Sequence, residues 1–167
     1  MNKTVTTMLT TAATCFLLYF LTGCKNEPVA LTAQQASVVK ESVQEFADSI
    51  AANITHKGPA EWLVYFKNSQ EFFMASAGNI AFANYDSARS FIQNVLVKNI
   101  SSINLKWSNV RIDPLTQTLA SLAANFHEDI TGNDGKALPY DGYFTAITEQ
   151  TSQGWKLRSV HWSLVGK

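Results

Sequence analysis

The sequence predicts an α+β domain in which three amino-terminal helices pack on a strongly curved antiparallel sheet. Apolar residues recur at helical spacing in the first half of the chain and alternate with polar residues in the second half. The alternation slips by one residue at Ser108-Asn109, which is typical of a bulge that bends a sheet. A sheet that curls over its helices leaves a cone-shaped cavity between the two layers.

The helices are predicted from three apolar stripes. The first stripe covers residues 33–57, Thr32 can cap its start, and the Gly58-Pro59 pair ends it. A short second helix covers residues 62–66, which are mostly aromatic or aliphatic. A third helix follows, with Asp86 as its N-cap.

The strands are predicted from alternation and from turn residues. Residues 71–83 form a small hairpin between the second and third helices, with its turn at Gly78-Asn79. Four long strands follow, at residues 103–112, 118–130, 142–151 and 155–165. We see no repeat and no second linker, so one domain accounts for residues 33–167.

The composition narrows the class of partner. The chain has 167 residues, of which 46% are apolar and 16% charged, and its formal net charge is zero. These values exclude a disordered chain and are typical of a well-filled core. A balanced charge provides no basic field, so we expect no nucleic-acid partner. The histidines lack the spacing of metal motifs, and we expect no metal and no cofactor.

The first 23 residues are typical of a secretory signal peptide. Lys3 is followed by an uncharged, largely apolar run that ends in small residues before Lys25. Several threonines dilute the run, which makes it a poor permanent membrane span.

The end of this run, Leu21-Thr22-Gly23-Cys24, resembles the lipobox of bacterial lipoproteins. The resemblance implies cleavage before Cys24 and a diacylglycerol on its thiol. We therefore expect a signal peptide at 1–23, a lipidated tether at 24–32, and a protein anchored by lipid in the bacterial cell envelope. Lys25 after the cysteine favours, by the same resemblance, the outer membrane.

The last strand supplies candidate residues for both faces of the sheet. Unbroken alternation assigns Trp155 and Leu157 to the helix-covered face, and with them the pocket candidates His161 and Ser163. His161 is then either a titratable pocket group or a core histidine with a hydrogen-bond partner. The same alternation assigns an apolar stripe to the outer face: Val160, Trp162 and Leu164. We expect a homodimer to cover this stripe, the alternative being cover by the tether or an edge element.

Other elements contribute polar or aromatic candidates for the pocket: Tyr65, Trp107, Asn125, His127 and Tyr143. Asn125 and His127 either line the pocket mouth or face water. Tyr65 and Tyr143 are either pocket hydroxyl groups or ordinary core tyrosines.

Phe46, residues 62–66 and the ending Gly154-Trp155-Lys156-Leu157-Arg158-Ser159-Val160-His161-Trp162-Ser163 resemble the nuclear transport factor 2-like superfamily and its SnoaL-like bacterial branch. The order of elements matches over nearly all of residues 33–165. The resemblance implies a cone-shaped pocket in a roll of three helices and a curved sheet, and frequent homodimers. The superfamily includes ketosteroid isomerase, scytalone dehydratase, polyketide cyclases and non-catalytic modules.

Fold alone does not name the function, so three hypotheses stay open. The first is a pocket that binds a small apolar or amphipathic ligand. The second is a SnoaL-like isomerase, dehydratase or cyclase with His161 or His127 as its base, its catalytic residues otherwise unknown. The resemblance places the isomerase base near Met74 or Ala75, and neither can move a proton, which argues against that chemistry. The third is a protein-interaction module without a ligand.

Overall fold

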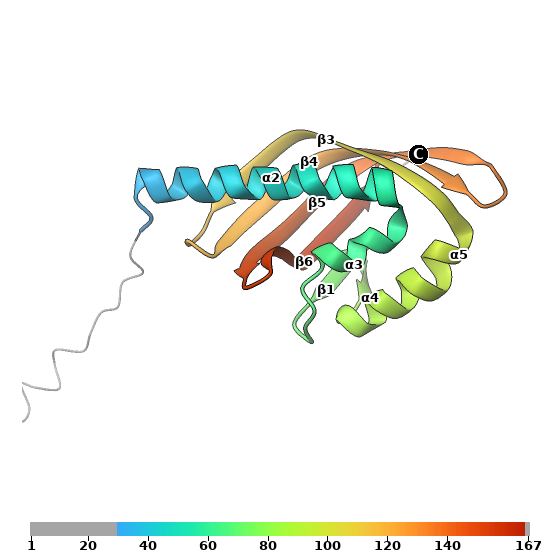
Figure 1. Ribbon diagram of the computed structural model, residues 1–167, viewed down its shortest axis with the longest axis horizontal. Coiled ribbons are helices and arrows are strands. Elements are labelled where there is room, and N and C mark those ends of the chain that lie inside the picture. The colour runs from blue at the N-terminus through green and yellow to red at the C-terminus, as the bar shows by residue number, and fades with distance from the viewer. Residues whose placement is uncertain (1–29, 166–167) are drawn as a thin grey trace, which may run out of the picture. The chain divides into compact units, whose positions relative to one another are not determined.

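The structure, a computed structural model, describes residues 30–165 (Figure 1). Its helical elements are α2 (Ala33–Lys57), the 3-10 turn Pro59–Glu61, α3 (Trp62–Tyr65), α4 (Tyr85–Phe91), the π-helical turn Ile92–Leu96 and α5 (Val97–Asn99). Its strands are β1 (Phe73–Ser76), β2 (Asn79–Phe82), β3 (Ile100–Pro114), β4 (Leu119–Gly132), β5 (Ala137–Thr151) and β6 (Gly154–Leu164). The six strands form one sheet in the order β2-β1-β6-β5-β4-β3.

The predicted fold class is confirmed: helices cover one face of a curved, mainly antiparallel sheet. Helix α2 packs mainly on β3, while the short α3 contacts β6 (Figure 1). The segment from α4 to α5 continues directly into β3 and faces the hairpin of β1 and β2. The buried core fills the space between these helices and the sheet.

Helix α2 begins and ends as predicted. Thr32 Oγ1 accepts the N–H of Gln35, and the Gln35 side chain accepts the N–H of Thr32, which completes a capping box. Gly58 ends the helix with φ at 89°, a conformation that suits glycine. The predicted third helix is α4, and it begins two residues earlier than predicted, because Asn84 and not Asp86 caps it and accepts the N–H of Ser87.

The hairpin is part of the main sheet, which sequence analysis did not predict. Strand β1 pairs in parallel with β6, so that Phe73 lies opposite Ser159 and Ala75 opposite His161. The β1–β2 turn lies at Ala77 and Gly78, both with positive φ, one residue before the predicted position.

The bulge predicted in β3 is confirmed. The register with β4 shifts between Ser108 and Arg111, and Asn109 has a φ of 52°. Asparagine tolerates this left-handed conformation better than most residues. Figure 1 shows β3 curving strongly towards α5.

A second bulge, in β6, corrects the predicted faces of the last strand. Leu157 pairs with Thr148 and Ser159 with Ile147, so Arg158 is the extra residue. Beyond it the side chains exchange faces. Val160 and Trp162 therefore turn towards the helices, and His161 turns to the outer face, where it is exposed.

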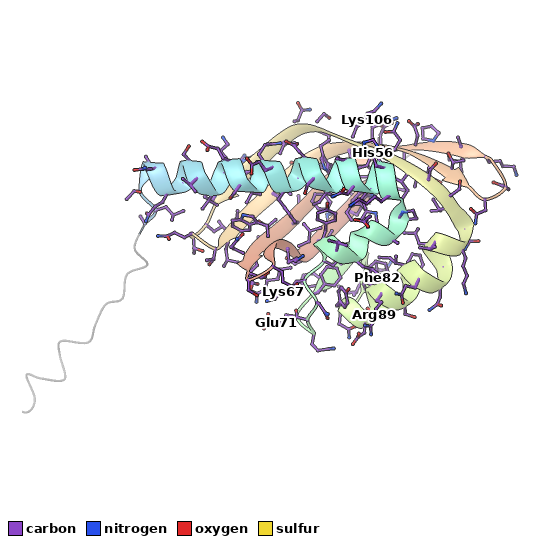
Figure 2. All side chains as sticks on the ribbon, in the orientation of Figure 1. His56, Lys67, Glu71, Phe82, Arg89 and Lys106 are labelled. Atoms are coloured by element: carbon purple, nitrogen blue, oxygen red, sulfur yellow. The ribbon has the colours of Figure 1, made fainter. Side chains whose placement is uncertain are left out.

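Four charged side chains surround the β6 bulge. The Arg158 guanidinium lies 3.4 Å from Glu71 and 3.5 Å from Glu149. Lys67 Nζ lies 2.9 Å from Glu149 and 3.2 Å from Glu71, close to the hairpin (Figure 2). Each pair is partly exposed and contributes little to stability alone, but the network ties the bulge to β5 and to the segment before β1.

Candidate functional site

A pocket of about 170 Å³ lies between the helix-covered face of the sheet and the segments that cover it. The sheet's long strands contribute five lining residues: Ile103, Glu128, Phe144, Val160 and Trp162. The helices and the hairpin contribute the rest: Trp62, Phe66, Met74, Phe82, Phe91, Ile92 and Leu96. Eleven of these twelve residues are apolar, and the exception is Glu128.

Trp162 is the centre of the aromatic wall. Its ring centroid lies 4.2 Å from that of Phe126, 5.3 Å from Phe144 and 5.6 Å from Trp62. Gly142 on β5 leaves room for the Phe126 ring, because a Cβ at this position would clash with it. These contacts fix the orientation of Trp162 and give the pocket a rigid wall.

The opposite wall is built from the β1–β2 hairpin and from α4 with the π-helical turn that follows it. Phe82 on β2 lies beside this helix (Figure 2), and its ring centroid is 5.3 Å from that of Phe91. Ile92 and Leu96 reach the pocket from the π-helical turn. Such turns frequently occur at functional sites, where they redirect side chains.

Glu128 on β4 is buried, with 6% of its surface exposed, and it faces the pocket. Its cross-strand neighbours are Leu105 on β3 and Tyr140 on β5. None of the described residues forms a hydrogen bond or an ion pair with its side chain. Desolvation by burial raises the pKa of Glu128 to about 7 from its ordinary value of 4.5. Near neutral pH this carboxyl is therefore a mixture of its neutral and charged forms.

Sequence reasoning missed Glu128, although the signal was present. Leu122, Ala124 and Phe126 occupy the inward positions of β4, and all three are buried. The next inward position is 128. A carboxylate in phase with a buried apolar face indicates either a buried acid or the end of the strand.

Two predicted pocket residues lie in the core and are not among the lining residues. The Tyr65 hydroxyl donates to the Ser49 carbonyl oxygen at 2.8 Å and accepts from the Asn53 side chain. Trp107 donates its Nε1–H to the Ala47 carbonyl oxygen at 2.9 Å. Both side chains support the layer between α2 and the sheet.

The other predicted pocket residues lie together on the outer face of the sheet. This corrects the expected placement of Tyr143, His161 and Ser163, whereas Asn125 and His127 take the second of their two alternatives and face water. Asn125, Tyr143 and Ser163 are cross-strand neighbours on β4, β5 and β6. Tyr143 is 43% exposed, and Ser163 donates its hydroxyl to the Tyr143 carbonyl oxygen. His161, opposite Thr145, points to the same side because of the Arg158 bulge.

His127 also faces outward, beside two carboxylates. Its Nδ1 lies 2.8 Å from Asp141, and its Nε2 lies 3.4 Å from Asp129. The hydrogen bond to Asp141 raises the pKa of His127. Neither this group nor any other group of His, Cys, Asp or Glu side chains within residues 30–165 is arranged to hold a metal ion.

The residues predicted to form a homodimer interface are placed differently from the prediction. Val160 and Trp162 belong to the pocket wall, and Leu164 is exposed at the end of β6. The predicted outer-face stripe therefore no longer supports the prediction of a homodimer. Sedimentation of the purified protein remains its direct test.

Cys24, the signal peptide at 1–23 and most of the tether lie outside the described residues. Within the described part of the chain, every helix is too short or too polar to cross a bilayer.

An arched sheet closed by helices around an apolar pocket is the nuclear transport factor 2-like fold, and solved structures share it. One is a nuclear transport factor 2-like superfamily protein from Salmonella enterica serovar Typhimurium, with a TM-score of 0.66 and 19% identity over 78% of this chain and 94% of that one. Another is a putative scytalone dehydratase from Novosphingobium aromaticivorans, with a TM-score of 0.69 and 11% identity over 81% and 89%.

A third similar structure is a hexachlorocyclohexane dehydrochlorinase, type 3, from Novosphingobium barchaimii. Its TM-score is 0.63, with 8% identity over 81% of this chain and 92% of that one. Comparison of the sequence with protein-family models and with curated proteins finds no match. At these identities the structural likeness establishes the fold and leaves the activity open.

Proposed function

We propose that this domain binds a small, largely apolar ligand in the pocket between the sheet and the segment from α4 to α5. The observation that carries the proposal is a lining of eleven apolar residues around about 170 Å³. A cavity of about 150 Å³ lined by aliphatic and aromatic residues stays dry and binds benzene. The size therefore favours a ligand of about one ring with a short substituent.

The proposal includes a lipid anchor at Cys24, which would hold the pocket at the bacterial cell envelope. Its support is the lipobox-like Leu21-Thr22-Gly23-Cys24 at the end of an apolar run. A membrane-associated species that begins at an acylated Cys24, identified by mass spectrometry, is the result expected. An unmodified and unprocessed chain would contradict this part of the proposal.

A second candidate function is catalysis of a proton transfer, and Glu128 is the observation that favours it. A carboxyl with a pKa of about 7 can act as an acid or a base at neutral pH. His161 and His127 lie on the outer face of the sheet, so neither reaches a ligand in this pocket. Conversion of a bound ligand by the protein, absent in a Glu128→Gln variant, would favour catalysis over binding alone.

Blocking the pocket tests the proposed function. Leu96 lines the pocket and is partly exposed, so Leu96→Trp should fill the space without disturbing the deeper core. We expect this variant to lose binding of isopropylbenzene by at least about tenfold, because the indole occupies the ligand's volume. The measurement is calorimetric titration.

The matched control is Val95→Trp, one residue earlier. Val95 is 42% exposed and does not line the pocket, so this variant should bind like the wild type. Equal binding by both variants, or no binding of isopropylbenzene and related one-ring compounds by the wild type, would contradict the proposed function.

A further inference from the structure

We propose that Glu128 makes this pocket selective for ligands that carry one hydrogen-bond acceptor, such as an aryl ketone, over hydrocarbons of the same shape. The inference rests on the proposed function, because it names the chemical class that the same pocket accepts. It is carried by one geometrical fact. The single polar side chain of the lining is buried, faces the cavity and has no partner among the described residues.

The Glu128 carboxyl has no hydrogen-bond partner within residues 30–165, and the small part of this residue that stays accessible opens on the pocket. A ligand that excludes water from the pocket must supply a partner for this polar group, or its burial is unfavourable. Leu105 and Tyr140 flank Glu128 on the adjacent strands, and neither hydrogen-bonds to it. The open direction is the pocket itself, so a bound ligand is in position to supply the missing partner.

The surroundings of Glu128 favour its neutral form when a ligand is bound. The titratable group that faces it from β5 is Tyr140, and β3 presents Leu105. Its strand neighbours His127 and Asp129 lie on the outer face. The helices and the hairpin present only apolar side chains to the pocket. No cationic side chain among the described residues is therefore close enough to stabilise the charged form of Glu128. A ligand that displaces water from the pocket desolvates the carboxyl further and favours its neutral form.

A neutral carboxyl has one O–H to donate, and this determines the class of ligand. A carbonyl oxygen accepts that hydrogen bond, whereas a hydrocarbon leaves the O–H unpaired in an apolar space. An ammonium group would need the charged carboxylate and would lose its own hydration against eleven apolar neighbours. A ligand with one acceptor at one end and an apolar ring thus fits both the shape and the chemistry.

The test compares acetophenone with isopropylbenzene, which have the same number of non-hydrogen atoms and nearly the same shape. Their dissociation constants are measured at about pH 5.5 and about pH 8.5 for the wild type, Glu128→Gln and Glu128→Leu. At about pH 5.5 we expect the wild type to bind acetophenone about five- to tenfold more tightly than isopropylbenzene. At about pH 8.5 we expect this preference for acetophenone to be lost. The amide of Glu128→Gln still donates but does not titrate, so its preference should be equal at both pH values.

Glu128→Leu has no donor, so at both pH values it should bind isopropylbenzene more tightly than acetophenone, whose carbonyl oxygen loses its hydrogen bonds to water without a replacement. Asp129→Asn, on the outer face, is the matched control and should behave like the wild type. Absence of binding of both compounds to all variants would reject the proposed function. Binding of both without a preference in the wild type at about pH 5.5, or a preference retained in Glu128→Leu, would overturn this inference alone. Tighter binding of 1-phenylethylamine than of acetophenone would also overturn it.

Discussion

Replacement of Trp162 by alanine is expected to lower the free energy of unfolding by about 3 kcal/mol, the lower end of the range for large core aromatic residues, because Trp162 is partly buried. The Trp162 ring contacts Phe126, Phe144 and Trp62, which belong to three different elements of the fold. Removal of the indole leaves a void, because the three remaining rings are held by different elements and cannot move to fill it. Urea denaturation followed by circular dichroism measures the loss.

The neighbouring residue provides the matched control. His161 is exposed on the outer face and forms no hydrogen bond with its side chain among the described residues, so His161→Ala should change stability by about 0.5 kcal/mol or less. An unbulged last strand predicts the reverse order, with His161 inside and Trp162 outside. The pair of variants therefore tests the Arg158 bulge, and a larger loss for His161→Ala would contradict it.

Glu128→Gln is expected to be more stable than the wild type at alkaline pH by up to about 3 kcal/mol. The pKa of Glu128 is about 7 in the folded protein, against an ordinary value of 4.5. Below pH 4.5 the carboxyl is neutral in both the folded and the unfolded chain, so the two proteins should be similarly stable. Between pH 4.5 and 7 the unfolded chain releases its proton first, and the wild type loses stability as the pH rises.

Above pH 7 the full cost of burying the charge is present in the wild type and absent in the variant. The measurement is the difference in unfolding free energy between the two proteins at about pH 4, 6 and 8.5. Titration of His127 contributes to both proteins equally and cancels in this difference. A difference that does not change with pH, or that favours the wild type at alkaline pH, would show that the Glu128 carboxyl is not buried in an apolar site.

Features that depend on local sequence could be predicted. The limits of α2 follow from its apolar stripe together with Thr32 and Gly58, and the β3 bulge follows from the slip at Ser108-Asn109. The β6 bulge gives the same kind of signal, because Leu157 and Val160 are three residues apart and not two. Alternation extended without a break across Arg158 exchanges the two faces, and with them the pocket and outer-face residues.

The pocket itself could not be predicted in detail because it joins segments that are distant in the chain. Phe82 and Leu96 meet Val160 and Trp162 only because β1 pairs in parallel with β6. This pairing is a long-range property that no periodicity within the hairpin reveals. Glu128 differs, since the alternation of β4 alone assigns it to the buried face.

The most direct test of the binding site is a crystal of the protein soaked in bromobenzene, in which anomalous scattering locates the bromine atom. Bromobenzene is small enough for a cavity of about 170 Å³. The result expected is a bromine peak enclosed by Leu96, Trp162 and Glu128, on the helix-covered face of the sheet. A peak on the outer face beside Tyr143 or His161, with the helix-covered pocket filled by the protein's own side chains, would contradict this assignment.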